Sequence, residues 1–344
     1  MEIKTLNSQE EILMWDEYIL KNINCTFYHF LGWKEIIEKS FGYKAIYLMA
    51  KSDNLKGVLP LFYIKSPLSG SRLVSLPMAD YGGVCADNVE AENLLIKEAI
   101  KITQKYKAGY LELRHINAKD SASLYTKIHK QTFILDLCQD FSFLWNNFIP
   151  EIRNRIKKAQ KSGLEIKIGG RELLDNFYFI YSFHMKELGT PVLGKVFFKN
   201  MCLKFPKNTK IFIVHHQGVL MGVALIIFFK DTIEVPWISS LGKYFPYCPN
   251  NLMYWEIIKY GCQQGFKYFD FGRSTKDSSH ALFKTRWGAR PVDLSWQYYS
   301  SNINRLPKIS PDNPRFGLAI NIWKKLPLLL TNSIGPKIAR HLPY

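Results

Sequence analysis

Apolar and polar segments follow one another in the same order in two parts of the chain. In the first part, apolar residues at 45–50 and 55–62 flank a short polar turn. In the second part, apolar residues at 210–215 and 219–228 flank a turn of the same kind. Two apolar segments joined by a short turn, the second containing glycine, predict a β-hairpin. We therefore expect one hairpin in each half of the chain.

A predicted helix and a predicted strand follow each hairpin. Apolar residues recur at helical spacing over 93–106 and again over 251–260. Each of these helices ends near a glycine, the residue that a left-handed helix cap favours. An apolar segment then follows, at 110–114 in the first half and at 266–271 in the second. The order of elements therefore occurs twice.

This doubling predicts two similar α/β domains, one at 1–148 and one at 149–300, followed by a tail at 301–344. A length of 344 residues suits two domains better than one. Two ordinary α/β units that resemble each other by chance would give the same pattern, and that alternative stays open.

A basic helix is predicted where the two halves meet. Pro150 suits a helix start and Gly163 a helix end. The helix would turn Ile152 and Ile156 inward and spread Arg153, Lys157 and Lys161 along one face. That face is either a solvated surface or an electropositive wall for phosphates or RNA.

The composition sharpens this picture in two ways. A hydrophobic fraction of 47% excludes a mostly disordered chain. The 46 Lys+Arg and 29 Asp+Glu give a formal net charge of +17, which favours phosphate-bearing or otherwise anionic partners. A charge that serves solubility alone is the alternative.

The cysteines and the N-terminus predict a cytoplasmic protein. The six cysteines are scattered without a CxxC pair, so we expect free thiols in a reducing compartment, with neither a zinc site nor a disulfide framework. The N-terminal residues are polar and do not form a secretory signal. The longest apolar run, 221–229, is far shorter than the roughly 20 residues of a membrane-spanning helix.

The candidate chemistry lies mainly in the second half. A polar, basic loop follows the predicted strand at 266–271, and binding groups in α/β folds concentrate in such loops. Asp270 alternates with two phenylalanines, so it can point from the opposite face of the sheet, and with Arg273 it forms either a site or a plain ion pair. Lys284 lies between Phe283 and Trp287, where an apolar shell would strengthen its charge. A surface lysine beside core aromatics is the alternative.

A similar group of residues lies in the first half. Asp80 and Tyr81 precede Gly82 and a second glycine, which indicates either a close approach of the backbone or a simple turn. Asp80 and Arg114 are spaced like the strand-end residues of a first domain.

Six strings of the chain together resemble one family. They are SLPMADYGGV (75–84), GYLELR (109–114), IRNRIKKAQKSGLE (152–165), CPNNLMYW (248–255), FDFGRS (269–274) and FKTRWGARPVDLSWQY (283–298). As a set they are similar to the FemAB-like acyltransferases, near the BioF2-like acetyltransferase group. The subfamily most alike is the one associated with XrtA/PEP-CTERM exopolysaccharide systems. The resemblance implies an α/β (α+β) fold of two tandem GNAT-like domains, with mixed sheets flanked by helices.

The resemblance also implies an activity, the transfer of an acyl or aminoacyl group to an amine. In peptidoglycan members the donor is aminoacyl-tRNA and the acceptor a nucleotide- or lipid-linked muropeptide. No permanently bound cofactor is implied, since the donor, aminoacyl-tRNA or acyl-CoA, is a co-substrate. Those members use the lysine of the FK…WG string, here Lys284, and the acid and arginine of FDFGRS are Asp270 and Arg273.

The expected site follows from these residues. Lys284 and Arg273 would face the oxyanion or the donor phosphate, and Asp270 or Asp80 would orient the amine or take its proton. No Ser-His-Asp or Cys-His set and no metal ligands are evident, so we expect direct transfer. Lys34 and Lys39 are further candidates for phosphate contacts. The predicted substrate contacts are Asp80, Tyr81, Gly82, Arg114, Arg153, Asn251, Ser274 and Trp287.

The tail and the basic helix leave alternatives. Residues 315–344 contain five basic residues and no acidic ones, and Pro327 and Pro336 should prevent one long helix. The tail at 312–344 either contacts an anionic inner membrane or packs on the first domain.

The function alternatives are a non-catalytic scaffold of an exopolysaccharide system and a nucleic-acid-binding protein. The absence of a basic-x-x-Gly-x-Gly/Ala turn disfavours acetyl-CoA as the donor.

Overall fold

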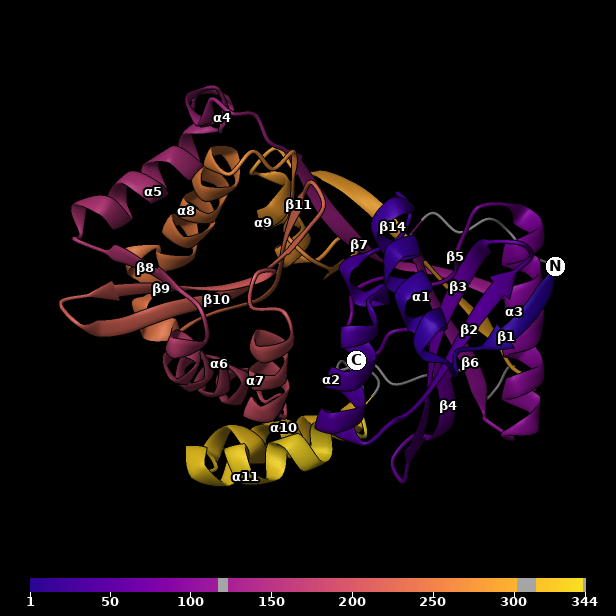
Figure 1. Ribbon diagram of the computed structural model, residues 1–344. Helices are drawn as coiled ribbons and strands as arrows, with labels where there is room; N and C mark the ends of the chain where they lie inside the picture. The colour runs from indigo at the N-terminus through magenta and orange to yellow at the C-terminus, as the bar shows by residue number, and fades with distance from the viewer. Residues whose placement is uncertain (117–122, 302–313, 343–344) are drawn as a thin grey trace. The chain divides into compact units, whose positions relative to one another are not determined.

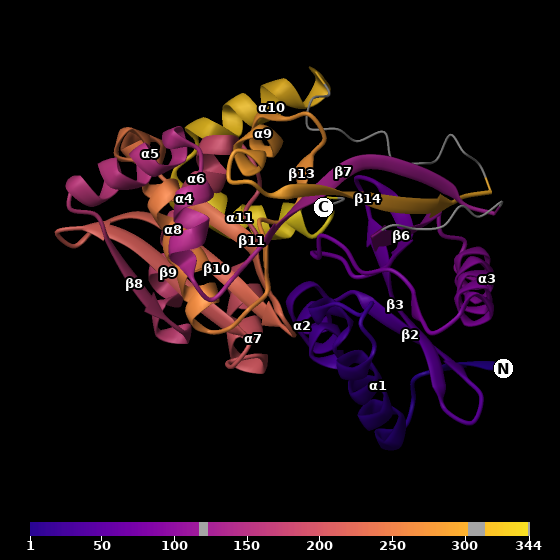
Figure 2. The same cartoon turned by 90° about the horizontal axis from the view of Figure 1, so that it is seen from above.

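The computed structural model describes residues 1–116, 123–301 and 314–342 (Figures 1 and 2). Contacts divide these residues into two compact units. The first unit comprises 1–116, 123–130, 293–301 and 341–342, and the second comprises 131–292 and 314–340. Each unit is described by itself.

The first unit is built on a mixed sheet in the order β1-β2-β3-β4-β6-β14, with β5 paired to β3. Only β4 and β6 are parallel neighbours. The strands are β1 (Glu2–Thr5), β2 (Lys44–Lys51), β3 (Leu55–Ser66), β4 (Gly70–Val74), β5 (Cys85–Ala86), β6 (Tyr110–Ile116) and β14 (Arg290–Tyr299). The helices are α1 (Gln9–Lys21), η1 (Phe27–His29), α2 (Leu31–Phe41) and α3 (Val89–Lys105).

The second unit has a sheet in the order β8-β9-β10-β11-β12-β7, with only β11 and β12 parallel. The strands are β7 (Tyr125–Asp136), β8 (Glu165–Gly169), β9 (Thr209–His216), β10 (Val219–Phe229), β11 (Thr232–Ser240), β12 (Tyr268–Asp270) and β13 (Ser274–Thr275). The helices are α4 (Phe141–Asn147), α5 (Pro150–Lys161), η2 (Arg171–Leu173), α6 (Leu174–Leu188), α7 (Lys195–Lys204), η3 (Gly242–Tyr247), α8 (Pro249–Gln263), α9 (Ser279–Thr285), α10 (Pro314–Lys325) and α11 (Leu328–Ala339).

The two sheets have the same strand order and the same directions, which confirms the doubling predicted from the sequence. The predicted hairpins are β2–β3 and β9–β10, each with antiparallel pairing. The predicted helices are α3 and α8, and each leads into the parallel strand of its sheet, β6 or β12. The register places Glu112 beside Val74 in the first sheet and Asp270 beside Glu234 in the second, so Glu112 and Asp270 are counterparts.

The last place in each sheet is filled by a strand that sequence order alone would not assign to it. In the first sheet it is β14, which follows all other strands of the chain and pairs with β6. In the second sheet it is β7, which precedes the other strands of that sheet in the sequence and pairs with β12. The boundaries between the two units therefore lie between Lys130 and Gln131 and between Val292 and Asp293. The sequence pattern predicts them at 148/149 and at 300.

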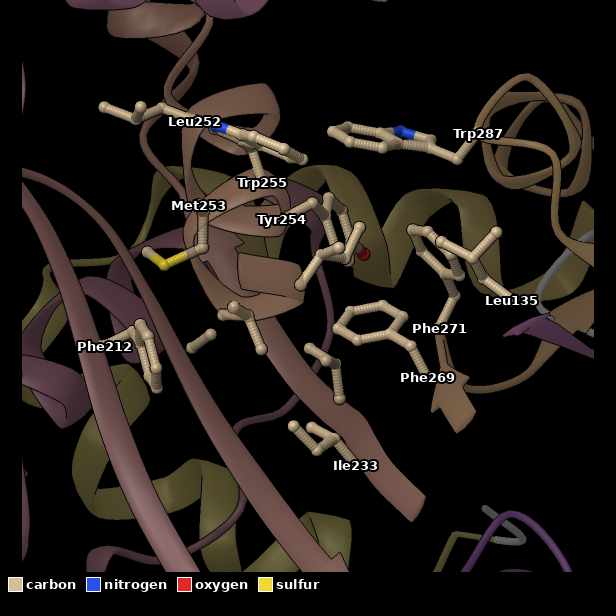
Figure 3. Close-up of a cluster of buried hydrophobic side chains, with 14 of the residues drawn as sticks. Leu135, Phe212, Ile233, Leu252, Met253, Tyr254, Trp255, Phe269, Phe271 and Trp287 are labelled. Atoms are coloured by element: carbon tan, nitrogen blue, oxygen red, sulfur yellow. The ribbon is translucent and has the colours of Figure 1, made fainter. Parts of the chain in front are cut away.

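The core of the second unit forms where α8 covers the sheet (Figure 3). Tyr254 of α8 packs with Phe269 of β12 and with Phe271, which follows that strand, and Trp255 packs with Phe148. The basic helix α5 packs beside α8 through Ile152 and Ile156, which are buried as predicted. This cluster fixes the end of β12, from which the loop at 271–273 begins.

The tail forms two helices of the second unit. Both α10 and α11 contact α6, on the side of α6 away from the sheet (Figure 1). Only the last described residues belong to the first unit, where Ser66 and Arg72 donate hydrogen bonds to the carbonyls of His341 and Leu342. The tail does not form one long helix, as predicted: Pro327 separates the two helices, whereas Pro336 lies inside α11. Within the ranges described, no helix is long and apolar enough to cross a membrane.

The prediction that all six cysteines are free is wrong for two of them. Cys25 and Cys85 form a disulfide within the first unit, with their Cα atoms 5.7 Å apart. They are 60 residues apart in sequence, and only the fold brings the chain after α1 next to β5. Cys138, Cys202, Cys248 and Cys262 are free thiols.

Candidate active site

The candidate site begins where two parallel strands separate. β11 and β12 pair over three residues only, and the last pair is Glu234 with Asp270. Beyond it β11 continues beside β10 to Ser240, whereas the chain after Asp270 leaves β11 and stays beside β7, where the Phe271 N–H donates to the Phe133 carbonyl. Ligands of α/β proteins bind at the carboxyl ends of such strands. This geometry presents the loop at 271–273 at the edge where a substrate would approach.

Asp270 fixes the first turn of this loop. Its side chain is fully buried, and its Oδ1 accepts hydrogen bonds from the Gly272 N–H at 2.8 Å and from the Thr132 hydroxyl. Phe269 and Phe271 lie in the core cluster, so Asp270 faces the other side of the strand, as the alternation predicted. Gly272 has φ +73°, a left-handed conformation that favours glycine.

Lys284 is held against the same loop from α9. Its side chain is buried, and its Nζ donates hydrogen bonds to the carbonyls of Gly272 at 2.7 Å and Arg273 at 3.2 Å. The ammonium lies 5.5 Å from the centre of the Phe133 ring. Gly272 therefore links the two predicted catalytic side chains, because its N–H meets Asp270 and its carbonyl meets Lys284.

The local sequence explains why α9 carries Lys284 to this position. The Ser278 hydroxyl caps the helix by accepting from the Ala281 N–H at 3.2 Å. Ala281 and Lys284, one turn apart, are the buried side chains of the helix, and Trp287 follows after the same interval. The lysine therefore lies on the inward face, in an otherwise apolar row.

Trp287 lies in the core and not at an open pocket wall. Its side chain is fully buried, and its ring lies 5.2 Å from Phe148 and 5.8 Å from Tyr254 between centres (Figure 3). Its indole N–H finds no hydrogen-bond partner among the described residues. The structure therefore places this predicted substrate contact inside the core, where Trp287 packs against Phe271.

Three other predicted contacts also lie in the second unit. Asn251 is the third residue of α8 and is buried, and its amide nitrogen has no hydrogen-bond partner in the part of the chain that the structure describes. Ser274 is buried at the start of β13, directly after Arg273. Arg153 is half-buried on α5.

The remaining predicted contacts form a separate group in the first unit. Arg114 is buried, and it donates hydrogen bonds to Glu112 Oε1 and to the Ala79 carbonyl, both at 2.8 Å, and stacks on Trp296 at 4.5 Å. The Gly82 N–H donates to the Arg114 carbonyl at 2.7 Å. Tyr81 is buried and Asp80 half-buried.

The predicted close approach at Gly82 is real, and it is made to the protein itself. Gly82 has φ +141°, and a Cβ there would lie 2.4 Å from Leu76 Cδ1. A Cβ on Gly83 would lie 2.3 Å from His115 Nδ1. Packing within the unit therefore explains both glycines.

The structure also reveals residues that the sequence did not single out. Thr132 contacts Asp270, and Glu112 is the first-unit counterpart of Asp270. An alignment of YLE at 110–112 with YFD at 268–270 would have found Glu112. Glu112 and Arg114 line a cavity of about 10 Å³, room for a single water. Its other lining residues are Tyr43, Ile64, Arg72, Val74, Pro77, Met78 and Leu342.

His115, next to Arg114, predicts a loss of stability in mild acid. Burial, helped by nearby His29, lowers the pKa of His115 from 6.5 to about 4. The unfolded chain therefore binds a proton at a higher pH than the folded one. Above pH 6.5 His115 is neutral in both states and does not change the free energy of unfolding. As the pH falls to 4, we expect the free energy of unfolding to decrease by up to about 3 kcal/mol. Urea titrations of wild type and His115→Gln from pH 7 to 4 measure it.

The exposed His280 provides the control for this prediction. His280→Gln should keep the pH dependence of the wild type, whereas His115→Gln should flatten it. Identical slopes in all three proteins would show that His115 is not the responsible group.

One family model matches the chain, at residues 146–284, and its description is acetyltransferase (GNAT) domain. The matched segment contains Asp270, Arg273 and Lys284, so the candidate site lies in the part of the chain that is similar to this family. No curated protein matches the sequence of the chain.

Several solved structures share the fold. A crystal structure of FemX has a TM-score of 0.69 at 17% identity and covers 87% of this chain and 97% of its own. L-PGS from Bacillus licheniformis has a TM-score of 0.54 at 12% identity, with 78% and 91% covered. A tandem GNAT protein from the clavulanic acid biosynthesis pathway has a TM-score of 0.56 at 10% identity, with 88% and 98% covered. The fold is thus the mixed α/β fold of tandem GNAT proteins.

Proposed function

We propose that the protein is an N-acyltransferase or aminoacyltransferase of the FemAB type. It transfers an acyl or aminoacyl group directly to an amine of a cell-envelope, peptidoglycan or exopolysaccharide-related acceptor. The observation that supports this most is the buried Lys284 ammonium, held 2.7 Å from the Gly272 carbonyl inside the segment that matches the GNAT model.

The reaction makes clear demands on such a site. A neutral amine attacks the ester or thioester carbon, the new C–N bond forms, the C–O or C–S bond breaks, and the amine nitrogen loses a proton. Negative charge builds on the carbonyl oxygen in between, and one well-placed donor to that oxygen is worth roughly 2.7–4 kcal/mol. A positively charged side chain that is already held in place can stabilise this oxygen without having to move. In our proposal Lys284 is that side chain.

The two carboxylates receive different roles. Asp270 is fully buried and accepts hydrogen bonds from Gly272 and Thr132, which suits a group that positions the loop holding Lys284. Asp80 is half-buried in the first unit, and its predicted role toward the acceptor amine stays a prediction. Arg273, beside Gly272, is assigned to the donor phosphate or the oxyanion.

The start of α8 supports aminoacyl-tRNA over acyl-CoA as the donor. In CoA-dependent GNAT domains, free amides at a helix start meet the pyrophosphate. Here the helix begins at Pro249, which has no N–H, and the segment before it contains no basic-x-x-Gly-x-Gly/Ala turn. The α5 helix offers another place for phosphates, because Lys157, Lys158 and Lys161 are all exposed on it.

Reversal of these three charges should weaken the binding of tRNA. For Lys157→Glu/Lys158→Glu/Lys161→Glu we expect about tenfold weaker binding or more near 0.1 M salt, because each lysine that contacts phosphate releases counterions. The slope of log affinity against log salt should fall by about two to three. Filter binding over a salt series measures both quantities.

The α3 helix supplies a matched control for this experiment. Lys97, Lys101 and Lys105 are also exposed and lie one turn apart on a helix of the other unit. Their reversal changes the net charge by the same amount. Equal losses in the two variants would assign the effect to overall charge and not to α5.

A transfer assay tests the proposed function directly. The full chain is incubated with envelope precursors and either a labelled aminoacyl-tRNA pool or a labelled acyl-CoA pool. We expect label from the tRNA pool in a product that resists hydroxylamine, as an amide does and an ester does not. Native mass spectrometry of the protein from its host identifies co-purifying ligands. Binding of a precursor without transfer from either pool would favour the scaffold alternative.

A further inference from the structure

The two tail helices expose several large aliphatic side chains. Leu329 is 84% exposed and Leu318 73% exposed, and Ile322, Leu330 and Ile334 are exposed as well. Other residues of the two helices are buried within the second unit, namely Trp323, Thr331, Gly335 and Ala339. The contacts that hold the tail in place therefore leave these side chains unused.

The exposed residues form two regular rows. On α10, Leu318, Ile322 and Lys325 follow at intervals of four and three residues, which places them on one face of a helix. On α11, Leu330, Ile334 and Lys337 have the same spacing. Each row thus consists of two aliphatic side chains and a lysine one turn further on. We call these six residues and Leu329 the tail face.

The charge around the tail face has one sign. From residue 317 to residue 342 the sequence contains no Asp or Glu, whereas Lys324, Lys325, Lys337 and Arg340 are all exposed. Aliphatic side chains flanked by lysines fit the boundary between the headgroups and acyl chains of a bilayer. There the leucines enter the apolar zone and the long lysine stems reach back to the headgroups.

We propose that the tail face is a membrane-binding surface for anionic lipid bilayers. The positive charge favours anionic headgroups. A bilayer can also bury the aliphatic side chains, whereas a soluble polyanion cannot. A second copy of the chain is a poorer partner. A two-fold contact would bring Lys325 and Lys337 against the same basic face, with no carboxylate from either helix to pair with them.

The test uses the full chain and lipid vesicles. Binding is measured by flotation with vesicles of phosphatidylcholine alone and of phosphatidylcholine with about one-third phosphatidylglycerol. We expect clear binding to the anionic vesicles only, and weaker binding in added salt. Lys325→Gln and Lys337→Gln should each reduce the affinity about fivefold. Ile322→Asn/Leu329→Asn should reduce it about tenfold or more.

The control variant carries equally exposed leucines elsewhere. Leu13 and Leu20 on α1 are 68% and 59% exposed, on a helix that also bears acidic residues. Leu13→Asn/Leu20→Asn should bind vesicles like the wild type, and all variants should unfold at the wild-type temperature. Equal binding by wild type and Ile322→Asn/Leu329→Asn, or none to anionic vesicles, would overturn the proposal. A dimer in light scattering that this variant abolishes would assign the tail face to self-association instead.

Discussion

Replacement of Lys284 by methionine is expected to slow acyl transfer by about 10²–10³-fold. Methionine keeps much of the length and the apolar stem but removes the positive charge. In our proposal that charge stabilises the oxyanion, and its fixed position explains why the loss falls on the chemical step. Single-turnover rates with saturating donor measure the effect, and substrate binding should change much less than the rate.

The same substitution has a structural cost that needs its own measurement. The carbonyls of Gly272 and Arg273 lose their donor, which costs about 1–3 kcal/mol of stability. Thermal unfolding of each variant separates this loss from the loss of rate. Lys259→Met is a matched control, since Lys259 is a partly buried lysine of α8 that pairs with Glu256. A folded Lys284→Met protein with the rate of the wild type would show that Lys284 only braces the loop.

Removal of the disulfide between Cys25 and Cys85 should lower the free energy of unfolding by up to about 4 kcal/mol. The bond closes a loop of 60 residues, and a cross-link of that length restricts the unfolded chain strongly. Chemical denaturation of the wild type and of Cys25→Ser/Cys85→Ser, each with and without reductant, measures it. We expect the two proteins to differ only when the wild type is oxidised.

Cys138→Ser provides the control, because Cys138 is a free, half-buried thiol. It should match the wild type under both conditions. Peptide mapping without reductant identifies the paired cysteines. A free thiol at Cys25 in oxidised protein would remove the basis of this prediction.

Much of the fold could be predicted because its signals are local. The hairpins β2–β3 and β9–β10, the helices α3 and α8 and the buried side of α5 all follow from periodicity within a few residues. The places of β14 in the first sheet and β7 in the second, and the disulfide, could not be predicted in this way. Which sheet β14 completes, and which thiol meets Cys25, depend on contacts between segments that are far apart in sequence.

In the candidate site, too, local features could be predicted from the sequence and contacts between distant segments could not. The alternation around Asp270 correctly predicted the side of the strand on which it lies, because strand geometry is local. The contact of Lys284 with the loop carbonyls needs α9 to fold back on the end of β12, and no spacing in the sequence encodes that. Trp287 was predicted as a substrate contact within the FK…WG string. Its burial depends on Phe148 and Tyr254, which come from two other helical segments.

The position of β14 has a consequence for synthesis of the protein. Residues 1–130 emerge from the ribosome first, yet β6 lacks its neighbour until residues 294–299 have been made. During that interval β6 would present an open edge, the kind of edge that recruits other strands and promotes aggregation. The sheet of the first unit, although most of it is encoded first, is therefore completed after the sheet of the second unit.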